Sequence, residues 1–332
     1  MTLTYSEKKS SSVPAPHVLS SPSSLTIPNT PDPRLPDPRP HLQTFSALIV
    51  GPPGSGKSRM ALTAPRPIHV LDIDKKMHQL DGLVDFTDVT YKQFPETGRK
   101  RISVSSSPDM RDPGKGFDPT SDPRLYYSVT DEINSFYDIL DKGGTLPFRT
   151  LVIDTISRLG EHLELLVMKL HHHDVLTISD WRTFLGNMLN LLNGLVDLPC
   201  NVVVTCHAKT EVDEITKAVR VLPGIAGQTA EKIGGFFQES YFLVPRLEGE
   251  EMKVDVLTRA TSKYSLRTSL CDLSIVPADL TRIVQGDFRG ENAKKILEER
   301  NKLKEMKGGA TGQSWALGQQ KEQKEQKEQK KQ

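Results

Sequence analysis

A glycine-rich turn between two apolar segments constrains the fold of this chain more than any other feature of its sequence. The turn runs from Gly51 to Ser58 and has the sequence GPPGSGKS. The apolar segment SALIV precedes it at 46–50, and KSRMALTA follows at 57–64 with apolar side chains at helical spacing. A buried strand, a glycine turn and a helix in this order match the phosphate-binding pattern G-x-x-x-x-G-K-[ST]. The sequence therefore predicts a P-loop nucleotide site.

Each part of the turn has an expected task in binding ATP. Its glycines let backbone N–H groups point at phosphate oxygens, and the helix N-terminus adds its dipole. Lys57 is expected to neutralise the β- and γ-phosphates, and the Ser58 hydroxyl to ligate Mg²⁺. The predicted nucleotide-binding residues are Gly51, Pro52, Pro53, Gly54, Ser55, Gly56, Lys57 and Ser58.

A second strand supplies a carboxylate for the same magnesium site. TLVIDT at 150–155 places Asp154 directly after apolar residues, and a P-loop site needs such a carboxylate at the end of a neighbouring strand. We therefore predict that Asp154 and Ser58 hold Mg²⁺; the alternative is that Asp154 caps the following helix, a position that Asp favours. A Glu directly after this Asp could activate water, but this chain has Thr155 there, so any general base must come from elsewhere.

The segment IHVLDID at 68–74 offers that carboxylate. Asp72 and Asp74 are two residues apart, so both are expected to face the same way, toward the carboxyl end of the strand where ligands bind in open α/β sheets. Asp74 is the preferred candidate for orienting the attacking water. Two lysines follow it, so solvated charges at a strand end are the alternative.

Histidines of interest occur at two further places. His207 follows the apolar segment NVVVTC at 201–206 and is expected beside the nucleotide site, as a sensor of the γ-phosphate or as a hydrogen-bonded surface histidine. The run HHHD at 171–174 is not predicted to bind metal, because consecutive histidines at a helix end point in different directions and no second set of ligands is spaced to complete a site. A favourable interaction with the helix C-terminus is expected there instead.

Helix-like and strand-like segments alternate between two polar ends. Continuous apolar strands interleaved with helices predict an α/β fold, with a mainly parallel sheet flanked by helices and antiparallel strands added at one edge. The predicted divisions are a disordered Ser- and Pro-rich arm at 1–42, an ATPase domain at 43–290, a C-terminal helix at 291–306 and a disordered charged tail at 307–332. Residues 105–124 form a polar insertion without periodicity, which is typical of a functional or mobile loop.

Composition narrows the range of partners and compartments. The 43 basic and 42 acidic side chains nearly cancel, so any contact with DNA must be local. Three cysteines without a CxxC pair suit a reducing compartment. Since the sequence has no long apolar run and no signal-peptide core, we expect no membrane association and a cytoplasmic location, which is the host cytoplasm if the chain is phage-encoded.

The ordered set of motifs resembles the RecA-like P-loop ATPases, and most closely the phage-encoded nucleotide-binding proteins of the AAA-domain type that act in recombination as single-strand annealing ATPases. The resemblance covers residues 44–287. VIDTISRL is similar to the second nucleotide motif of this family, and LDID is similar to the strand that carries its catalytic carboxylate, with Asp74 in place of Glu. His207 falls where the family places a polar sensor ahead of a DNA-binding loop.

This resemblance implies a RecA-like core in which ATP is bound between protomers of a ring or filament. Arg267, in TRATSKYSLRTSL, matches a basic position that reaches into the neighbouring subunit's active site, although a surface arginine is the alternative. Ser269 stands where the family has a second basic residue. The residues expected to take part in catalysis are Lys57, Asp74, Asp154, His207 and Arg267.

The resemblance also implies that single-stranded DNA stimulates ATP hydrolysis and is held through its phosphates. The DNA is expected along Lys209, Lys217 and Arg220, for which a solvated charged face is an equally good explanation. The two polar ends of the chain are candidates for recruiting a single-strand binding protein or another replication partner.

Two other function classes stay open on the sequence alone. A nucleotide-gated assembly or scaffold module would bind ATP without turnover. A P-loop kinase would transfer phosphate to a small molecule, although no Arg-rich lid follows the second nucleotide motif. ATP turnover would distinguish a DNA-dependent ATPase from a scaffold, and stimulation of turnover by DNA would distinguish it from a kinase.

Overall fold

The computed structural model describes residues 44–94, 124–173, 175–213 and 217–306. Contacts between Cα atoms divide the chain into the units Met1–Leu42 and Gln43–Gln332, and all described residues belong to the second. The predicted arm and tail lie outside the described residues, as does the predicted insertion except for its last residue, Arg124.

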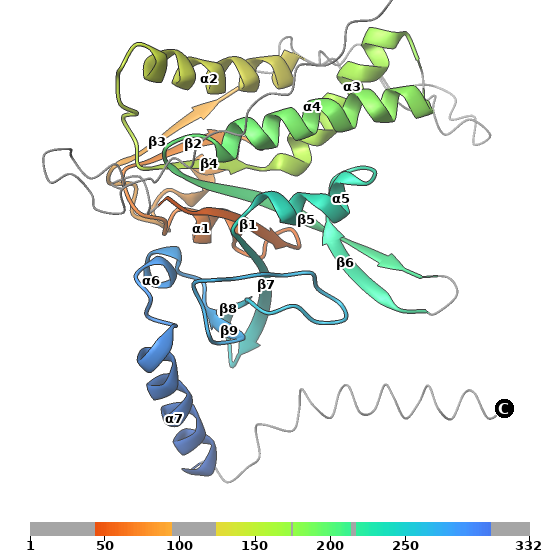
Figure 1. The fold of residues 1–332 in the computed structure, drawn as a ribbon. Coiled ribbons are helices and arrows are strands. Elements are labelled where there is room, and N and C mark those ends of the chain that lie inside the picture. Colours follow the sequence, from red (N-terminus) through yellow and green to blue (C-terminus); the bar gives the residue numbers. More distant parts are fainter. Residues whose placement is uncertain (1–43, 95–123, 174, 214–216, 307–332) are drawn as a thin grey trace, which may run out of the picture. The chain divides into compact units, whose positions relative to one another are not determined.

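Strands and helices alternate through the described residues (Figure 1). The strands are β1 (Ser46–Gly51), β2 (Ile68–Asp72), β3 (Val89–Gln93), β4 (Thr150–Asp154), β5 (Asn201–Val212), β6 (Val219–Pro223), β7 (Glu239–Glu248), β8 (Glu251–Leu257) and β9 (Ile275–Pro277). The helices are α1 (Lys57–Ala61), α2 (Arg124–Asp141), α3 (Ile156–His171), α4 (Ile178–Val196), α5 (Thr229–Lys232), α6 (Leu280–Val284) and α7 (Gly290–Met306), with 3₁₀ helices η1 (Met77–Leu80) and η2 (Ile233–Phe236). Within the described ranges, none of the helices has both the length and the apolar character needed to span a bilayer.

The strands form one sheet in the order β3-β2-β4-β5-β1-β7-β8-β9. From β3 to β7 every neighbouring pair is parallel. Strands β8 and β9 continue the sheet in antiparallel pairing. The predicted α/β fold with a mainly parallel sheet and antiparallel strands at one edge is therefore confirmed.

Strand β6 joins the sheet away from that edge, by pairing with β5. The apolar segment 201–206 forms only the first half of β5, which continues to Val212 with half-buried and exposed side chains. β6 pairs antiparallel with residues 208–212 of this extension. The central strand therefore runs out of the core into an exposed hairpin.

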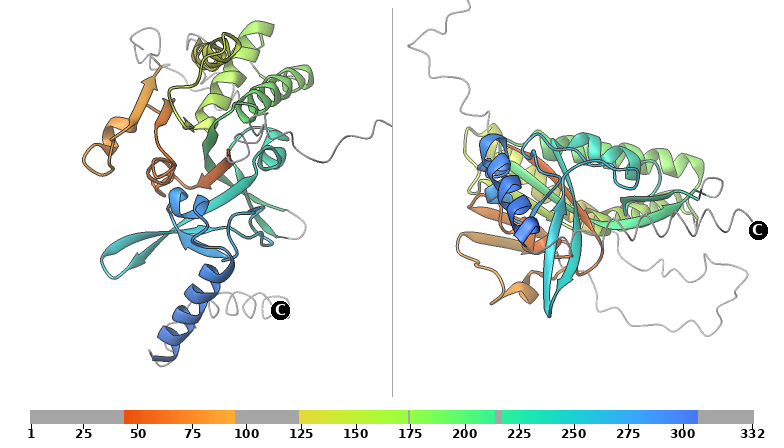
Figure 2. Two further views of the ribbon diagram at one scale, coloured as in Figure 1. Left: turned by 60° about the vertical axis from the view of Figure 1, so that its left-hand side comes forward. Right: turned by 90° about the horizontal axis from the view of Figure 1, so that it is seen from below.

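Alternate side chains of the central strands face two separate layers of helices. Leu48 and Val50 pack in one core with residues of α2, α3 and α4. Ala47 and Ile49 pack in a second core with residues of α1, α6 and α7. The three helices α2, α3 and α4 lie together on the same side of the sheet in the different views (Figures 1 and 2). Because both faces are covered, the buried parts of the central strands are mostly apolar.

Side-chain caps fix where α3 and α4 begin. At the start of α3, Thr155 Oγ1 accepts a hydrogen bond from the backbone N–H of Arg158. At the start of α4, Thr177 and Asp180 form a reciprocal capping box. The first cap, Thr155, directly follows Asp154 at the carboxyl end of β4, and α3 begins at Ile156.

Candidate nucleotide site

The glycine-rich turn connects β1 to α1 with a backbone that its glycines make possible. Gly54 and Gly56 adopt left-handed conformations, with φ of 73° and 86°, which glycine takes at little cost. At Gly51, a Cβ atom would lie 2.5 Å from Ser55 Oγ and 3.2 Å from Leu243 Cβ. The local geometry therefore accounts for each of these three glycines.

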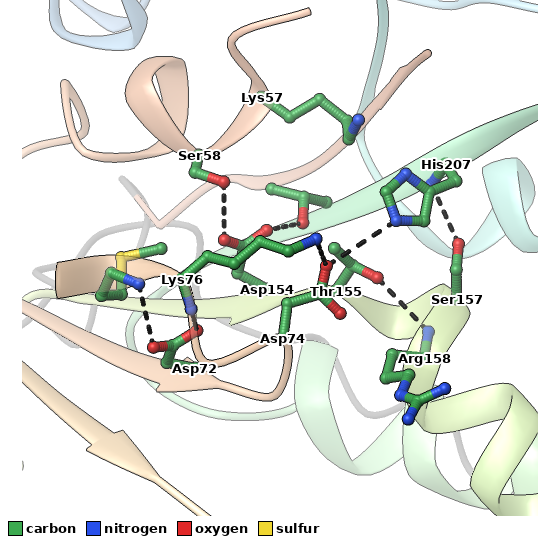
Figure 3. Close-up of polar contacts among 12 residues, drawn as sticks. Lys57, Ser58, Asp72, Asp74, Lys76, Asp154, Thr155, Ser157, Arg158 and His207 are labelled. Carbon is green, nitrogen blue, oxygen red and sulfur yellow. Dashed lines mark hydrogen bonds and ion pairs between the residues drawn. The ribbon is translucent and has the colours of Figure 1, made fainter. Parts of the chain in front are cut away.

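The turn lines a pocket of about 390 Å³ at the carboxyl ends of the parallel strands. Residues 53–59 form one wall; Asp74 and Thr155 reach the pocket from just beyond the ends of β2 and β4, and His207 reaches it from the middle of β5. Figure 3 shows how closely these side chains approach one another. Four elements far apart in the sequence thus meet at the P-loop.

Lys57 is positioned by carbonyl groups of the turn itself. Its Nζ donates hydrogen bonds to the carbonyl oxygens of Gly51, at 3.0 Å, and Pro52, at 2.8 Å. Burial lowers the pKa of Lys57, and the nearby carboxylate of Asp154 opposes this shift only in part. The arrangement holds an ammonium group at the mouth of the turn, where phosphate oxygens would lie.

Asp154 lies between two hydroxyl groups. Ser58 Oγ donates to its Oδ2 at 2.6 Å, and Thr205 Oγ1 donates a short hydrogen bond to its Oδ1. The side chain is 1 % exposed. Burial raises the pKa of Asp154, and the hydrogen bonds from Ser58 and Thr205 lower it by less.

The structure corrects one expectation about Asp154 and rules out another. Its strand is not a hydrogen-bonded neighbour of the P-loop strand, because β5 lies between β4 and β1 in the sheet. Asp154 meets the turn through the side chain of Ser58, which reaches it from the start of α1. The alternative that Asp154 caps α3 does not hold, since Thr155 is the capping residue.

Asp72 and Asp74 do not face the same way, contrary to the prediction. The buried carboxylate of Asp72 accepts hydrogen bonds from the backbone N–H groups of Lys76 and Met77, each at 3.0 Å, and from Gln93 Nε2 at 2.8 Å. These bonds turn the chain after β2 ends at Asp72. Asp74 therefore lies past the strand, where alternation no longer applies, and it alone of the two borders the pocket.

Asp74 and His207 form a second polar pair at the pocket. His207 Nε2 lies 3.7 Å from Asp74 Oδ2, and Lys76 Nζ donates to the same oxygen at 3.0 Å. Burial raises the pKa of Asp74, but the interactions with His207 and Lys76 outweigh it, so the pKa lies below its ordinary value. The backbone N–H of Asp74 also donates to the carbonyl of Asp154 at 3.2 Å. An ionised carboxylate is thus fixed beside the P-loop.

Arg267 does not line this pocket. Its carbonyl accepts a hydrogen bond from Ser240 N at 2.8 Å, and its side chain is exposed beside a surface hollow that Glu231 and Lys232 share. Its action in a neighbouring subunit therefore stays a prediction.

The basic residues expected to hold DNA lie on the β5–β6 hairpin, outside the pocket. Lys209 Nζ pairs with Glu211 at 2.8 Å. Arg220 stands opposite Glu211 in the register of the two strands, and Lys217 has a left-handed backbone with φ of 55°. All three side chains are exposed, and their contact with DNA stays a prediction.

Thr205 and Lys76 also contact the carboxylates of the site, and neither was predicted from the sequence. Thr205 is the polar residue inside the otherwise apolar end of NVVVTC, and a hydroxyl in a buried strand is a signal that some polar partner lies close. Lys76 is one of the two lysines after LDID that suggested solvated charges. Its ion pair with Asp74 shows that one of them belongs to the site.

Comparisons with known proteins find similar solved structures and one matching family model. Among solved structures, the chain is similar to a KaiC-like protein of the archaeon Pyrococcus horikoshii OT3, with 16% identity, a TM-score of 0.33, and coverage of 70% of this chain and 88% of that one. It is also similar to the flagellar accessory protein FlaH of Methanocaldococcus jannaschii, with 11% identity, a TM-score of 0.31, and coverage of 64% and 76%. A search of curated proteins finds no match. A family model described as an AAA domain matches residues 44–247.

This matched segment is more than half of the chain and contains the turn and the carboxylates and histidine around it. The chain therefore belongs to the AAA-domain family, and its described core is a nucleotide-binding P-loop ATPase domain.

Proposed function

We propose that this protein hydrolyses ATP with Mg²⁺, and that single-stranded DNA stimulates the reaction in phage-type recombination, repair or replication, with strand annealing as the outcome. The observation that carries the ATPase part is the convergence of three polar groups on one pocket. These groups are the Lys57 ammonium, the Ser58–Asp154 pair and the Asp74–His207 pair.

The Ser58–Asp154 pair fits a magnesium ion. Mg²⁺ is a hard cation that prefers oxygen ligands and is held in such sites by few protein groups together with substrate phosphates. Ser58 Oγ and Asp154 Oδ2 are two oxygens 2.6 Å apart beside the phosphate-binding turn. Bound there, the ion would neutralise charge on the β- and γ-phosphates. Asp154 is held ready by Thr205, which binds its other oxygen.

Asp74 is suited to orienting water and poorly suited to removing its proton. A carboxylate with a lowered pKa is a weak base, but it accepts a hydrogen bond from water strongly in the ionised form. Its oxygen is shared with Lys76 and His207, which fix its direction. Because phosphoryl transfer depends mostly on positioning and electrostatics, orientation of water by Asp74 is the role we assign.

His207 connects this site with the hairpin proposed to bind DNA. Its backbone N–H donates to Ser157 Oγ on α3 at 2.9 Å, and its carbonyl accepts from Gly224 N at 2.7 Å. The hairpin at 208–223 therefore leaves the sheet at His207 and returns to it. If the His207 side chain moves when the bound nucleotide changes, the movement would be transmitted to both ends of the hairpin.

The hairpin supports binding through phosphates. It carries Lys209, Lys217 and Arg220 and no aromatic residue, so stacking on bases has no platform there. Exposed lysines and arginines contact the DNA backbone without reading its sequence. This agrees with an annealing function, which must accept any sequence.

The proposal extends to a homo-oligomer, a ring or a filament, in which Arg267 reaches the ATP of the neighbouring protomer. An arginine supplied in this way stabilises the charge of the transition state. The exposed side chain of Arg267, away from its own P-loop pocket, supports this role. The proposal includes a cytoplasmic location and recruitment of a single-strand binding protein or replication partner through the two ends of the chain.

Steady-state ATP hydrolysis with and without a single-stranded oligonucleotide tests the proposal. We expect turnover that DNA stimulates, loss of all turnover in Lys57→Ala, and loss of the stimulation alone in the triple variant Lys209→Ala, Lys217→Ala, Arg220→Ala. Lys294→Ala, an exposed lysine on α7, is the matched control.

Two outcomes would contradict the proposal and favour the alternatives. Tight ATP binding without turnover would indicate a nucleotide-gated assembly module. Turnover that DNA does not change, together with phosphate transfer to a small-molecule acceptor, would indicate a kinase.

A further inference from the structure

Two histidines and a buried carboxylate converge where α3 ends and α4 begins. His171 and His173 lie at the end of α3, and Asp180 lies in the first turn of α4. One nitrogen of each ring and one carboxylate oxygen all lie within 4.8 Å of one another. We propose that these three residues bind a first-row transition-metal ion, with Zn²⁺ as the expected occupant.

The geometry overturns the reason for expecting no metal here. Histidines in consecutive helical positions would point apart, but His172 has a left-handed backbone, with φ of 55° and ψ of 40°, and ends the helix. The chain therefore turns between His171 and His173, and both rings face Asp180. His173 Nδ1 lies 2.7 Å from Asp180 Oδ2, and His171 Nδ1 makes a short contact with Oδ1.

The carboxylate is held in place by groups that are not ligands. Its side chain is 0 % exposed, and Oδ2 accepts hydrogen bonds from Thr177 N at 2.7 Å and from Thr177 Oγ1 at 2.8 Å. Such second contacts orient a metal-binding carboxylate. Thr177 contacts Oδ2, so Oδ1, which lies against His171 Nδ1, is the oxygen expected to bind the ion.

The two imidazoles complete a partly open site. Their side chains are 36% and 39% exposed, so an ion between them is reachable from solvent. Three protein ligands with water in the remaining position is a common arrangement for zinc. Each ring would bind through the lone pair of Nδ1 and carry its proton on Nε2, so metal binding displaces a proton from every Nδ1 that bears one.

The donor set selects the kind of ion. Two nitrogens and one oxygen suit Zn²⁺, Co²⁺ or Ni²⁺, whereas Mg²⁺ prefers oxygen alone. The Ser58–Asp154 pair, which offers only oxygen, should therefore take Mg²⁺ and leave Zn²⁺ to the histidines. The three cysteines do not compete, because burial raises the pKa of Cys200 to about 12 and those of Cys206 and Cys271 to about 11.

The ion would act as a clamp at the end of α3 remote from the nucleotide. Sixteen residues of α3 separate Thr155 at the P-loop pocket from the cluster, a length of about 24 Å at the usual helical rise. The clamp would hold the end of α3 against the start of α4, next to the exposed apolar side chains of Leu170, Val175 and Ile178. The proposal is independent of ATP turnover.

The test is binding of Zn²⁺ and Co²⁺ to the full chain, carrying no histidine tag, after treatment with a chelator and without nucleotide. Calorimetry with Zn²⁺ should give one ion per chain, and Co²⁺ should give the visible absorption of a nitrogen-ligated ion. The double variant His171→Gln, His173→Gln should lose both signals. His172→Gln, a change at the histidine outside the cluster, should keep them.

Further variants separate metal binding from folding and from the P-loop. Asp154→Asn should bind Zn²⁺ as the wild type does, and Thr177→Ala should bind it about tenfold more weakly, because it loses a group that orients Asp180. The circular dichroism and ATP affinity of the double variant should match the wild type, so that loss of Zn²⁺ is read on folded protein. Absence of Zn²⁺ binding in the wild type, or equal binding in the double variant, overturns the proposal and leaves a plain hydrogen-bonded helix cap.

Discussion

A buried aspartate lies near each end of α3, and the pKa values of the two carboxylates are shifted in opposite directions. Asp154, just before the helix, is 1 % exposed, and Asp180, beyond its other end, is 0 % exposed. Burial raises the pKa of both. At Asp154 the hydroxyl partners do not compensate, so its pKa is raised, whereas at Asp180 the contacts with His171, Thr177 and His173 outweigh burial and lower it.

At these two buried carboxylates, the hydrogen-bond donors decide the direction in which the pKa shifts, because burial raises the pKa of both. Hydroxyl groups carry no charge and leave Asp154 in need of a cation. The imidazoles and the backbone N–H around Asp180 provide that compensation within the protein. The carboxylate at the first end is thus suited to a cation that arrives with the nucleotide, whereas the carboxylate at the second end already has its hydrogen-bond donors within the protein.

The largest expected effect, on activity, comes from Asp154→Asn. ATP turnover should fall by about 10²-fold or more, because a group that stabilises charge in the transition state is lost. The unfolding free energy should change by less than about 1 kcal/mol, because the relief of a buried charge offsets a weakened hydrogen bond. Turnover and urea denaturation measure the two effects. A stable variant with full turnover would remove Asp154 from the site.

The corresponding change at the other end, Asp180→Asn, should affect stability more than ATP turnover. The amide cannot accept from both histidines and from Thr177 as the carboxylate does, so the midpoint of thermal unfolding should fall clearly below that of Asp154→Asn. Thermal scans of both variants at neutral pH make the comparison. Equal stability of the two variants would mean that the donors around Asp180 do not compensate its charge.

The two helix caps give a smaller and more closely matched comparison. Thr177→Ala should lower the unfolding free energy by about 1 kcal/mol, and Thr155→Ala by less. The reason is that Thr177 Oγ1 both donates to Asp180 at 2.8 Å and accepts from its backbone, whereas Thr155 Oγ1 only accepts from Arg158 N, at 3.3 Å. Serine at either position should restore stability. A larger loss at Thr155 would contradict the assignment of the stronger cap.

Local sequence was enough to predict the P-loop and Asp154, since a strand, a glycine turn and a helix are written in adjacent residues. It was not enough where a distant contact decides. Thr205 meets Asp154 because β5 lies between β4 and β1, and sheet order is not a local property. Asp72 and Asp74 diverge because Asp72 binds backbone groups four and five residues later.

The histidine run shows the same limit at a single residue. Its interpretation assumed helical backbone through all three positions, but His172 is left-handed. Asn, Asp and His adopt this conformation more often than other non-glycine residues, which was the available signal. The partner of the two rings, Asp180, lies at the start of a helix, where Asp is a favoured capping residue. Its position therefore suggested no other role.

Glu164, within α3, gives an effect that depends on pH and tests what burial does alone. Burial, with a contribution from Glu161, raises its pKa from 4.5 to about 7. The folded state therefore keeps a proton that the unfolded chain releases, so this group's stabilising contribution is full below pH 4.5 and is lost as the pH rises to about 7.

Glu164→Gln removes this dependence. The variant should be more stable than the wild type at pH 8 by about 1 to 2 kcal/mol, allowing for screening of a partly solvated side chain, and the advantage should shrink toward pH 5. Urea denaturation at the two values measures it. If the difference in stability does not vary with pH, hydrogen-bond donors offset the effect of burial on the pKa of Glu164, as they do at Asp180.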